Sequence, residues 1–579
     1  MTPREAGAAL AEIAMLLEVV GGNPFRARAF QAAARALETS AADLAALAAE
    51  GRLRSLPGVG EGIATVLQEL IATGSATLLE ELRSRTPAGL YDLMRIKGLG
   101  AKRIRTLYAE LGIDTLDAVE EAAAAGRIAQ LPGFGARTEQ KILEGVAFAR
   151  SLRGRRRRFQ AVASAAGLLE LVEGLPGVRR ASSAGELRRR LEVVSSLELV
   201  AASMDPPATL AAFRALQGGE PDADPSRATS RLSDGLAVEL RCVAPGEYAT
   251  ALLFATGSEG HLAALAERAE ARRLRLAADG LFRGKTRVET PDEPAVYDAL
   301  ELAWVPPELR EGWGEVEAAA EGRLPALLEV DDLRGTFHCH TTFSDGRATL
   351  AEMAEGARAR GWRYLGIADH SQAAGYAGGL SPAAVRKQQR EIDAWNRAHG
   401  GRGESRFRLL KGIEADILAD GRLDYGDDVL RTFDYVVGSV HSGFGMTERE
   451  MTDRLLRAVA SPHLTILGHA TGRLLLRRDG YAVDVRAVID AAAEHGVAVE
   501  INADPNRLDV DWRTARYAAD RGVLVPIDPD AHSVAALGNV AHGVDVARKA
   551  WLTRAQVPNA WELEPLEEWL AERKQKGAA

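Results

Sequence analysis

Hydrophobic positions in the first part of the chain recur every three or four residues, the spacing of one face of an α-helix. The clearest runs are 9–20, 30–37 and 44–49. They predict an all-helical region from Thr2 to about Arg150. A strongly basic stretch, 150–158, follows and predicts an exposed linker or a surface that faces phosphate groups.

After the basic stretch the pattern changes to a mixture of short strands and helices. Apolar segments predict strands at 193–202, 236–243 and 251–254. Helical spacing recurs between them, at 168–173, 207–216 and 261–272. We therefore expect an α+β unit. The proline-containing segment 291–334 is predicted to connect this unit to the last one.

From Phe337 onward, short strands alternate regularly with helices. The predicted strands are 364–368, 408–414, 435–440, 465–468, 498–502 and 524–528. Strictly alternating strands and helices indicate parallel strands, so this region is predicted to be a barrel-like α/β domain.

Length and composition restrict the class of protein. A chain of 579 residues is too long for one core, so several domains are expected. Only two cysteines occur, and neither a leader-like start nor a membrane-length apolar stretch is evident, which predicts a cytoplasmic protein with no membrane partner. The net charge of −9 does not decide whether DNA is bound, because charge acts by patch.

One turn motif recurs three times in the helical region, at 56–60, 96–100 and 131–135, each time with Gly-x-Gly before a helix. Such a turn exposes backbone N–H groups to which a phosphate can bind. The motif resembles the helix-hairpin-helix, which implies a grip on the DNA backbone without sequence readout. The expected DNA-binding residues are Gly58, Gly60, Gly98, Gly100, Gly133, Gly135, and, from the basic stretch, Arg155, Arg156, Arg157 and Arg158.

Candidate metal ligands lie at or near the ends of the predicted parallel strands. The set comprises His338, His340, Asp345, His370, Glu414, His441, His469, Asp530 and His532. The carboxyl ends of parallel strands meet at one mouth, so these side chains should lie close together. Imidazole and carboxylate suit zinc, manganese or iron, and the ligands are too many for one ion. We expect two or three divalent ions.

This ligand string resembles the polymerase-and-histidinol-phosphatase (PHP) superfamily over roughly residues 333–575. The resemblance implies a distorted seven-stranded βα barrel that hydrolyses phosphoesters with the help of its metal ions. Arg473, Asn502 and Arg507 also follow predicted strands. They are candidates for gripping substrate phosphates, and a supporting or surface role is an equal alternative.

The order of the parts resembles the bacterial family X DNA polymerases over essentially the whole chain. The resemblance implies a helical DNA-end-binding domain, a fingers-like helical domain, palm-like and thumb-like domains, a linker and a PHP domain. The corresponding limits are 1–80, 81–150, 151–243, 244–320, 321–335 and 336–579. Gapped, primer-template or damaged DNA is the implied partner. The sequence indicates no fixed oligomeric state, and a monomer is our working expectation.

The polymerase centre implied by this family is altered. Family members hold two Mg²⁺ ions with three aspartates, at positions where this chain has Ser196, Glu198 and Glu239. Glu186 replaces a serine that binds the nucleotide in the family, whereas Arg188 and Arg189 are retained. Mg²⁺ demands near-ideal octahedral geometry, so we expect little nucleotide addition with Mg²⁺, and Mn²⁺ as the cation that would rescue it.

A second family pocket persists. Thr256-Gly257-Ser258 resembles a motif that contacts the incoming nucleotide, so Gly257 and Ser258 join the arginine pair as candidate dNTP-binding residues. Some relatives also remove a 5′ sugar phosphate through a lysine Schiff base. Val66 stands at the matching position, and no lysine precedes Lys97, so we expect this activity to be absent.

Three functions follow from these features. The first is a DNA-repair enzyme whose barrel hydrolyses DNA as a 3′-5′ exonuclease, with AP-endonuclease or 3′-end-cleaning action as variants at the same metals. The second is a gap-filling DNA polymerase, using Mg²⁺ or Mn²⁺, whose barrel processes ends. The third is a DNA-binding scaffold without catalysis.

Overall fold

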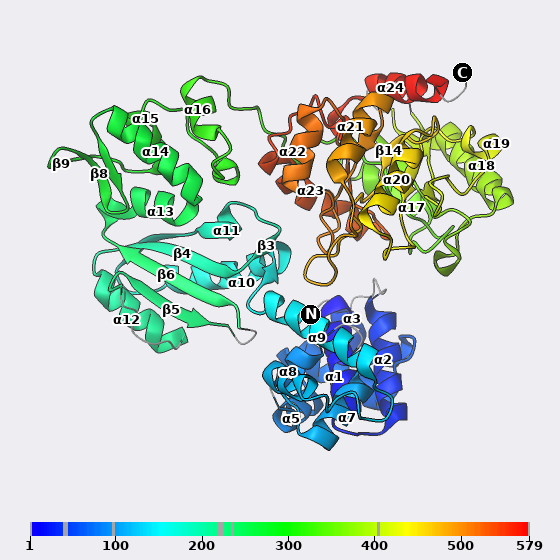
Figure 1. Cartoon of the computed structure of the whole chain (residues 1–579), viewed down its shortest axis with the longest axis horizontal. Coiled ribbons are helices and arrows are strands. Elements are labelled where there is room, and N and C mark those ends of the chain that lie inside the picture. The colour runs from blue at the N-terminus through cyan, green and yellow to red at the C-terminus, as the bar shows by residue number, and fades with distance from the viewer. Residues whose placement is uncertain are drawn as a thin grey trace. The chain divides into compact units, whose positions relative to one another are not determined.

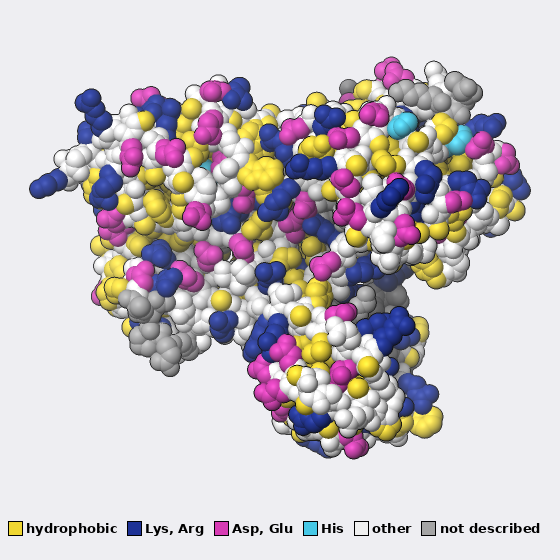
Figure 2. All heavy atoms as spheres, viewed as in Figure 1, with side chains coloured by type: hydrophobic (Ala, Val, Ile, Leu, Met, Phe, Trp, Pro, Cys, Tyr) yellow, Lys and Arg dark blue, Asp and Glu magenta, His cyan; other side chains and the backbone are white. Residues whose placement is uncertain are grey.

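The computed structural model describes residues 3–38, 44–87, 89–94, 96, 99–217, 224–232, 235–401 and 406–576. The chain forms two compact units, 1–153 and 154–579, which are described separately below (Figure 1). Acidic and basic side chains are interspersed over the face of the molecule shown in Figure 2.

The first unit is helical throughout its described residues, as predicted. It contains α1 (Pro3–Val19), α2 (Pro24–Glu38), α3 (Leu44–Ala49), α4 (Glu61–Thr73), α5 (Thr77–Arg85), α6 (Gly89–Leu93), α7 (Ala101–Leu111), α8 (Leu116–Ala124) and α9 (Ala136–Leu152). Two apolar clusters hold these helices, one around Leu10, Phe30 and Leu67 and one around Leu107 and Val119. Among the described helices none is by itself long and apolar enough to cross a membrane, whereas α4 and α5 together, with a 95° bend between them, pass on length and composition.

The second unit begins with a four-stranded sheet of order β2-β4-β6-β5. Its strands are β2 (Val178–Ser183), β4 (Ser196–Ser203), β5 (Arg227–Arg231) and β6 (Ala237–Val243), and β4 and β6 are parallel. Helices α10 (Arg158–Glu173) and α12 (Pro206–Gln217) share an apolar core with Leu197, Leu199 and Leu240 of the sheet. Because side chains alternate along a strand, Ser196, Glu198 and Glu239 fall on the other face.

The predicted strand at 251–254 is wrong. These residues lie within helix α13 (Tyr248–Thr256), where Ala249, Ala251, Leu252 and Leu253 are all buried. A short apolar run fits a helix buried all round as well as a buried strand, so periodicity alone could not separate the two.

The next part contains α14 (Glu259–Ala271), a three-stranded sheet and two further helices. The strands are β7 (Arg275–Ala277), β8 (Gly280–Arg283) and β9 (Thr286–Val288), and the helices are α15 (Glu293–Ala299) and α16 (Glu315–Ala320). The segment predicted as a connector therefore carries two helices, and its side chains Val296, Leu300 and Val316 belong to the core of this part.

In the last part, strands and helices alternate along the chain as predicted. The strands are β10 (Tyr364–Ile367), β11 (Arg408–Lys411), β12 (Glu414–Asp416), β13 (Val437–Ser439), β14 (Ile466–Leu467), β15 (Ala498–Val499), β16 (Ile501–Asn502) and β17 (Ile527–Asp528). The helices are α17 (Leu350–Arg358), α18 (Pro382–His399), α19 (Asp427–Leu430), α20 (Glu448–Val459), α21 (Val485–His495), α22 (Trp512–Asp520), α23 (Val540–Lys549) and α24 (Leu563–Lys576). All pairings between these strands are parallel.

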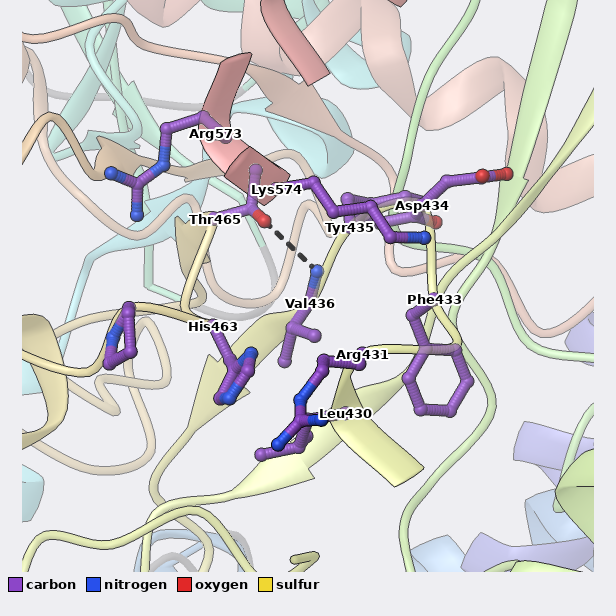
Figure 3. A pocket seen from close by; sticks show the side chains of 11 residues that line it. Leu430, Arg431, Phe433, Asp434, Tyr435, Val436, His463, Thr465, Arg573 and Lys574 are labelled. Carbon is purple, nitrogen blue, oxygen red and sulfur yellow. Dashed lines mark hydrogen bonds between the residues drawn. The ribbon is translucent and has the colours of Figure 1, made fainter. Parts of the chain in front are cut away.

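Histidines occur at both ends of the parallel strands in this part. A small pocket at the amino ends of β13 and β14 is lined by Arg431, His463 and Arg573, and there the N–H of Val436 donates to Thr465 Oγ1 at 3.2 Å (Figure 3). His441 and His469 instead follow the carboxyl ends of the same two strands. The candidate ligands therefore gather at the end of the sheet opposite this pocket.

Candidate metal centre

The predicted ligands converge at the carboxyl ends of the parallel strands. Glu414 lies just past the carboxyl end of β11, as the first residue of β12, while His441 and His469 follow β13 and β14. Segment 338–340 hydrogen-bonds to residue 531, which brings His338 and His340 beside Asp530 and His532. Six of the eleven histidines lie in this cluster, all of them at positions identified from the sequence.

Glu414 lies at the middle of the cluster, and its carboxylate is 1% exposed. Its Oε1 atom lies 3.3 Å from His338 Nε2, 3.2 Å from His441 Nε2 and 3.1 Å from His469 Nε2. Its Oε2 atom lies 2.8 Å from His370 Nδ1. One buried carboxylate is thus surrounded by four imidazoles from four different segments of the chain.

Two further carboxylates complete the cluster. Asp530 Oδ1 lies 3.2 Å from His340 Nε2, and Asp345 Oδ1 lies 3.3 Å from His532 Nε2. The donor atoms form three overlapping groups with all separations within 4.8 Å: His340-Asp345-His370-His532, His338-His340-Asp530 and His370-Glu414-His441. A set that divides in this way can hold more than one cation.

The buried ligand atoms have the properties expected of metal donors. His338 Nε2, His340 Nε2 and Glu414 Oε2 are buried, and although neighbouring side-chain atoms approach them, none is aligned for a hydrogen bond. A buried polar atom without a partner is costly, and several close together call for a ligand that they share. Nitrogen and carboxylate donors fit zinc, manganese or iron, and the residues present therefore fit the expected ions.

The close packing of charged groups shifts the pKa values of these histidines in opposite directions. Burial, together with neighbouring positive charge, lowers the pKa of His340 to about 3 and that of His469 to about 4. Burial also opposes protonation of His441 and His532. However, the charge of Glu414 beside His441 and the bond from His532 to Asp345 raise their pKa values to about 10 and about 9. A divalent cation would replace the protons that now balance the carboxylates.

Glu500, which no sequence pattern singles out, supports two of the candidate ligands. Its Oε1 lies 2.7 Å from His338 Nδ1, and its Oε2 accepts the backbone N–H of His469 at 2.6 Å. Asp416 holds His441 in the same way, 2.5 Å from its Nδ1. Such contacts fix the ring orientation of a ligating histidine. The available signal was a glutamate inside the apolar strand sequence 497–501.

Replacing Glu500 by glutamine is expected to weaken metal binding about 10- to 100-fold, the usual effect of losing a carboxylate behind a ligating histidine. The amide retains the size of the side chain but lacks the charge that orients His338. Metal content after dialysis against graded chelator would measure the change. Glu494→Gln, an exposed position on α21, is the matched control; equal metal retention in the two variants would contradict this role.

The three polar residues proposed as phosphate contacts differ in their surroundings. Asn502 Nδ2 donates to Asp530 Oδ2 at 3.1 Å, and Arg507 Nε lies 4.0 Å from the same oxygen. Arg473 is bound to the backbone carbonyl of Arg507 at 3.2 Å and to Glu192 at 3.2 Å. Of the two arginines, Arg507 therefore lies beside the cluster, and Arg473 is bonded to the backbone of the loop that carries Arg507.

Two ligands have left-handed backbone conformations, with φ of 26° at His469 and 50° at Asp530. Non-glycine residues adopt this region at some cost, and such positions concentrate at functional sites. His469 follows β14 and Asp530 follows β17, so both unusual conformations occur directly after a strand.

The residues at the three predicted polymerase positions lie on one face of the four-stranded sheet, the face on which α13 packs against Val200 and Ala202. Glu198 and Glu239 are direct neighbours on parallel strands β4 and β6. Ser196 Oγ donates to Glu198 Oε1 at 3.0 Å, and burial raises the pKa of Glu198. Glu239 is paired with Arg227 at 3.4 Å. Within the described part of the chain, these three positions belong to no group of three metal donors.

The residues predicted to bind the nucleotide are bonded to other protein groups. Arg188 donates to Glu293 at 2.9 Å, and Arg189 donates to Glu311 at 3.0 Å and to the carbonyl of Thr256 at 2.6 Å. Ser258 caps α14 by accepting the N–H of His261 at 3.2 Å, directly after Gly257. Glu186 faces Ser195, from whose N–H it accepts at 2.6 Å.

The glycine turns end where helices begin. Gly60, Gly100 and Gly135 are the N-cap residues of α4, α7 and α9, and a Cβ atom at each would meet open space. Gly58 and Gly133 have φ values of 75° and 81°, a conformation that favours glycine. Gly98 lies outside the described residues. The first turns of these helices therefore present backbone N–H groups without side-chain cover.

The basic stretch is only partly exposed, contrary to expectation. Arg155 is exposed, but Arg156 and Arg157 form strand β1 and pair with β3 (Val193–Val194). Arg157 bonds to Asn506, and Arg158 forms an ion pair with Asp545. Long-range carboxylate and amide partners therefore draw part of this stretch against the protein itself.

Comparison with known proteins agrees with this order of parts. The helix-hairpin-helix domain family matches residues 1–76, and a SAM-like helix-hairpin-helix tandem matches residues 90–147. The DNA polymerase beta thumb family matches residues 251–311, and the PHP domain family matches residues 336–504.

Relatives of this chain cover either its whole length or part of it. The DNA polymerase/3′-5′ exonuclease PolX of Bacillus subtilis (strain 168) is 35% identical over 568 residues, which cover 97% of this chain and 98% of that protein. A "probable phosphatase" of Thermoanaerobacter sp. (strain X514) is 28% identical over 29% of this chain and 70% of its own length. Another, of Edwardsiella ictaluri (strain 93-146), is 28% identical over 38% of this chain and 88% of its own length. Together, the full-length match and the ordered domain families show that this chain belongs to the family X DNA polymerases that carry a carboxy-terminal PHP domain.

Proposed function

We propose that this protein is a DNA-repair enzyme that hydrolyses DNA from a 3′ end at its PHP metal centre and that its polymerase centre is degraded. The contrast between the two sites carries the proposal. Three overlapping donor groups lie in the PHP part, and several of their ligand atoms are buried without a partner. The polymerase-like positions offer a serine and two glutamates, one of them paired with an arginine.

In this proposal the nine predicted residues bind two or three divalent ions, which would activate water and stabilise the leaving oxygen. The chain contributes orientation and charge. Glu500 and Asp416 fix the rings of His338 and His441, and Asn502 holds Asp530. Arg507 supplies the nearby positive charge that a phosphodiester requires, 4.0 Å from Asp530.

The domain limits and the closure of the PHP barrel are part of the same proposal. The domain limits derived from the sequence divide each compact unit further, and the family resemblance implies closure of the PHP strands into seven-stranded form. The parallel pairing of the named strands, together with a parallel bridge between Cys339 and Ala531, supports that closure. We also propose that the glycine turns and Arg155 contact the DNA backbone.

A gap-filling polymerase is the second candidate. The retained arginine pair and the name of the Bacillus relative, DNA polymerase/3′-5′ exonuclease, favour it. Product analysis on 5′-labelled gapped and primer-template DNA, with Mn²⁺ or Mg²⁺ and with or without dNTPs, separates the candidates. Stepwise shortening indicates an exonuclease, and extension indicates a polymerase. One cut at an abasic site indicates an endonuclease, and loss of only a 3′-phosphate indicates an end-cleaning enzyme.

A scaffold without catalysis is the remaining alternative from the sequence. Metal analysis of the purified protein tests it, since a barrel that only supports the fold has no need of the donor groups. Two or more equivalents of metal, lost in the His338→Ala/His340→Ala variant, would exclude the scaffold.

Borohydride trapping on a 5′ sugar phosphate is expected to fail. Val66, at the position of the family's lysine, is 5% exposed within α4, and no lysine precedes Lys97 to form a Schiff base. The measurement is the yield of covalent protein-DNA adduct after reduction, compared with a lyase-active family X enzyme. An adduct mapped by proteolysis to residues 1–80 would contradict the prediction.

A further inference from the structure

A groove along two outer helices of the PHP part combines arginines with aromatic rings. It has a cavity volume of about 470 Å³, and its lining includes Trp313, Arg486, Arg513, Arg516 and Tyr517. Two helices of the PHP part, α21 and α22, form its floor, and the loop before α16 forms its rim. Figure 2 shows Lys and Arg side chains beside a hydrophobic patch in the region of α22.

The groove starts at the end of the PHP part that carries the metal ligands. Helix α21 follows β14, and helix α22 follows β16, so both begin on the carboxyl side of the strands. Arg486 and Arg513 are the second residues of these helices. The loop that leads into α22 also carries Arg507, which lies 4.0 Å from Asp530. One short loop therefore connects the groove to the metal centre.

The charge of the groove favours an anion. Arg516 is paired with Asp520 at 3.1 Å, whereas Arg486 and Arg513 have no carboxylate partner among the described residues. Their guanidinium groups lie over aromatic rings instead, 5.0 Å from the centre of Tyr517 and 4.4 Å from that of Trp512. Stacking on a ring leaves the edge N–H groups of a guanidinium available to phosphate oxygens.

Trp313 supplies an aromatic surface in a fixed position. Trp313 is 50% exposed, and the centre of its ring lies 4.8 Å from that of Trp512, with the two rings tilted by 58°. Glu315 accepts the backbone N–H groups of Gly312 and Trp313 at 2.8 and 2.6 Å, and Glu315 is itself held by the buried His261 at 2.7 Å. An indole presented by such a braced loop is preordered for stacking with a flat ligand.

From these features we infer that the groove binds a single-stranded segment of the DNA substrate, with bases against Trp313 and Tyr517 and phosphates at Arg486 and Arg513. Arginines and aromatic rings together bind single strands without sequence preference, which suits an enzyme that shortens many ends. The volume matches one or two nucleotides, within the size range of ligand pockets. This inference rests on the proposed function, because it assigns a path to the strand that the metal centre cleaves.

Charge reversal in the full-length protein tests the inference. Arg486→Glu/Arg513→Glu should lower kcat/KM for hydrolysis of a dT12 strand at least tenfold, since phosphate contacts and stacking are lost. Turnover of the p-nitrophenyl ester of thymidine 5′-phosphate, which is too short to reach the groove, should stay unchanged. Arg358→Glu/Arg431→Glu, which reverses two exposed arginines at the other end of the strands, is the matched control.

Crosslinking locates the strand independently of hydrolysis. A dT12 strand carrying 5-iodouracil should crosslink to Trp313 or Tyr517 on irradiation, as mapped by mass spectrometry. Trp313→Ala should lose the crosslink at residue 313 and lower kcat/KM for dT12, whereas Trp313→Phe, which keeps an aromatic ring and the packing, should retain most of both.

These experiments distinguish a failure of the groove proposal from a failure of the proposed function. Wild-type kcat/KM for dT12 in the charge-reversal variant would overturn the groove. So would crosslinks confined to other parts of the chain, or displacement of dT12 by polyglutamate as effective as by dT12 itself, the latter indicating a site for an acidic protein. Crosslinking at Trp313 without hydrolysis of either substrate would support the groove and contradict the proposed nuclease.

Discussion

His338→Ala/His340→Ala is expected to lower the rate of 3′-end shortening about a thousandfold. Metal ions contribute several kcal/mol to transition-state stabilisation in phosphoester hydrolysis, and about 1.4 kcal/mol corresponds to a factor of ten in rate. The two imidazoles belong to overlapping donor groups, so removing both disrupts binding of more than one ion. Denaturing gels of a 5′-labelled primer-template in Mn²⁺ would measure the rate.

The control for this result is Glu198→Ala, which alters the palm sheet and leaves the donor groups intact. It should shorten DNA at the wild-type rate. Chelator should abolish shortening by wild-type protein, and added Mn²⁺ should restore it. Shortening that survives in the histidine variant at close to the wild-type rate would place the nuclease elsewhere, or in a contaminating protein.

Wild-type protein is expected to add nucleotides with Mg²⁺ at a rate at least about a hundredfold below that of the Bacillus relative, because the two-metal site lacks one carboxylate and has two lengthened ones. Ser196 offers only a hydroxyl, which is bonded to Glu198, and Glu239 is partly neutralised by Arg227. Extension of a primer opposite a one-nucleotide gap, with the nuclease removed by the two histidine substitutions, measures addition without degradation.

Restoration provides the second half of this test. Ser196→Asp/Glu198→Asp/Glu239→Asp should raise Mg²⁺-dependent addition above wild type, provided that the arginine pair can release its carboxylate partners. Mn²⁺ should help the wild-type protein more than the restored one, because it tolerates less ideal geometry. Addition by the wild type at the relative's rate in Mg²⁺ would show that the glutamates are adequate ligands and would favour the polymerase candidate.

Local spacing was sufficient to predict several features of the fold. The second glycine of each turn was predicted to precede a helix, and Gly60 and Gly135 are indeed N-cap residues. The start of a helix is determined by residues that are adjacent in sequence, so a local motif is enough to predict it. Strand-helix alternation in the last part was equally readable. Residues 251–254 were misassigned because complete burial, rather than periodicity, governs a short apolar helix.

The metal ligands were predictable for a related reason. His338 and His340 alternate along an extended segment, and parallel strands share one carboxyl end, so strand polarity alone gathers residues that are far apart in sequence. Family resemblance completed the set. Glu500 could not be predicted in this way, because its role depends on two partners, His338 and His469, that approach it only after the strands have paired.

The surroundings of charged residues were the feature least predictable from the sequence. Arg158 was expected to be exposed, yet its partner Asp545 lies 387 positions away. Arg486 and Arg513 gave no signal in sequence, because what distinguishes them is the combination of missing carboxylates and neighbouring rings. Whether an arginine is bound or available depends on long-range partners, and repeating patterns in a sequence record only short-range order. The sequence by itself therefore determined the helices, the strands and the types of candidate metal ligand. Which charged side chains pair with one another was decided only by the tertiary structure.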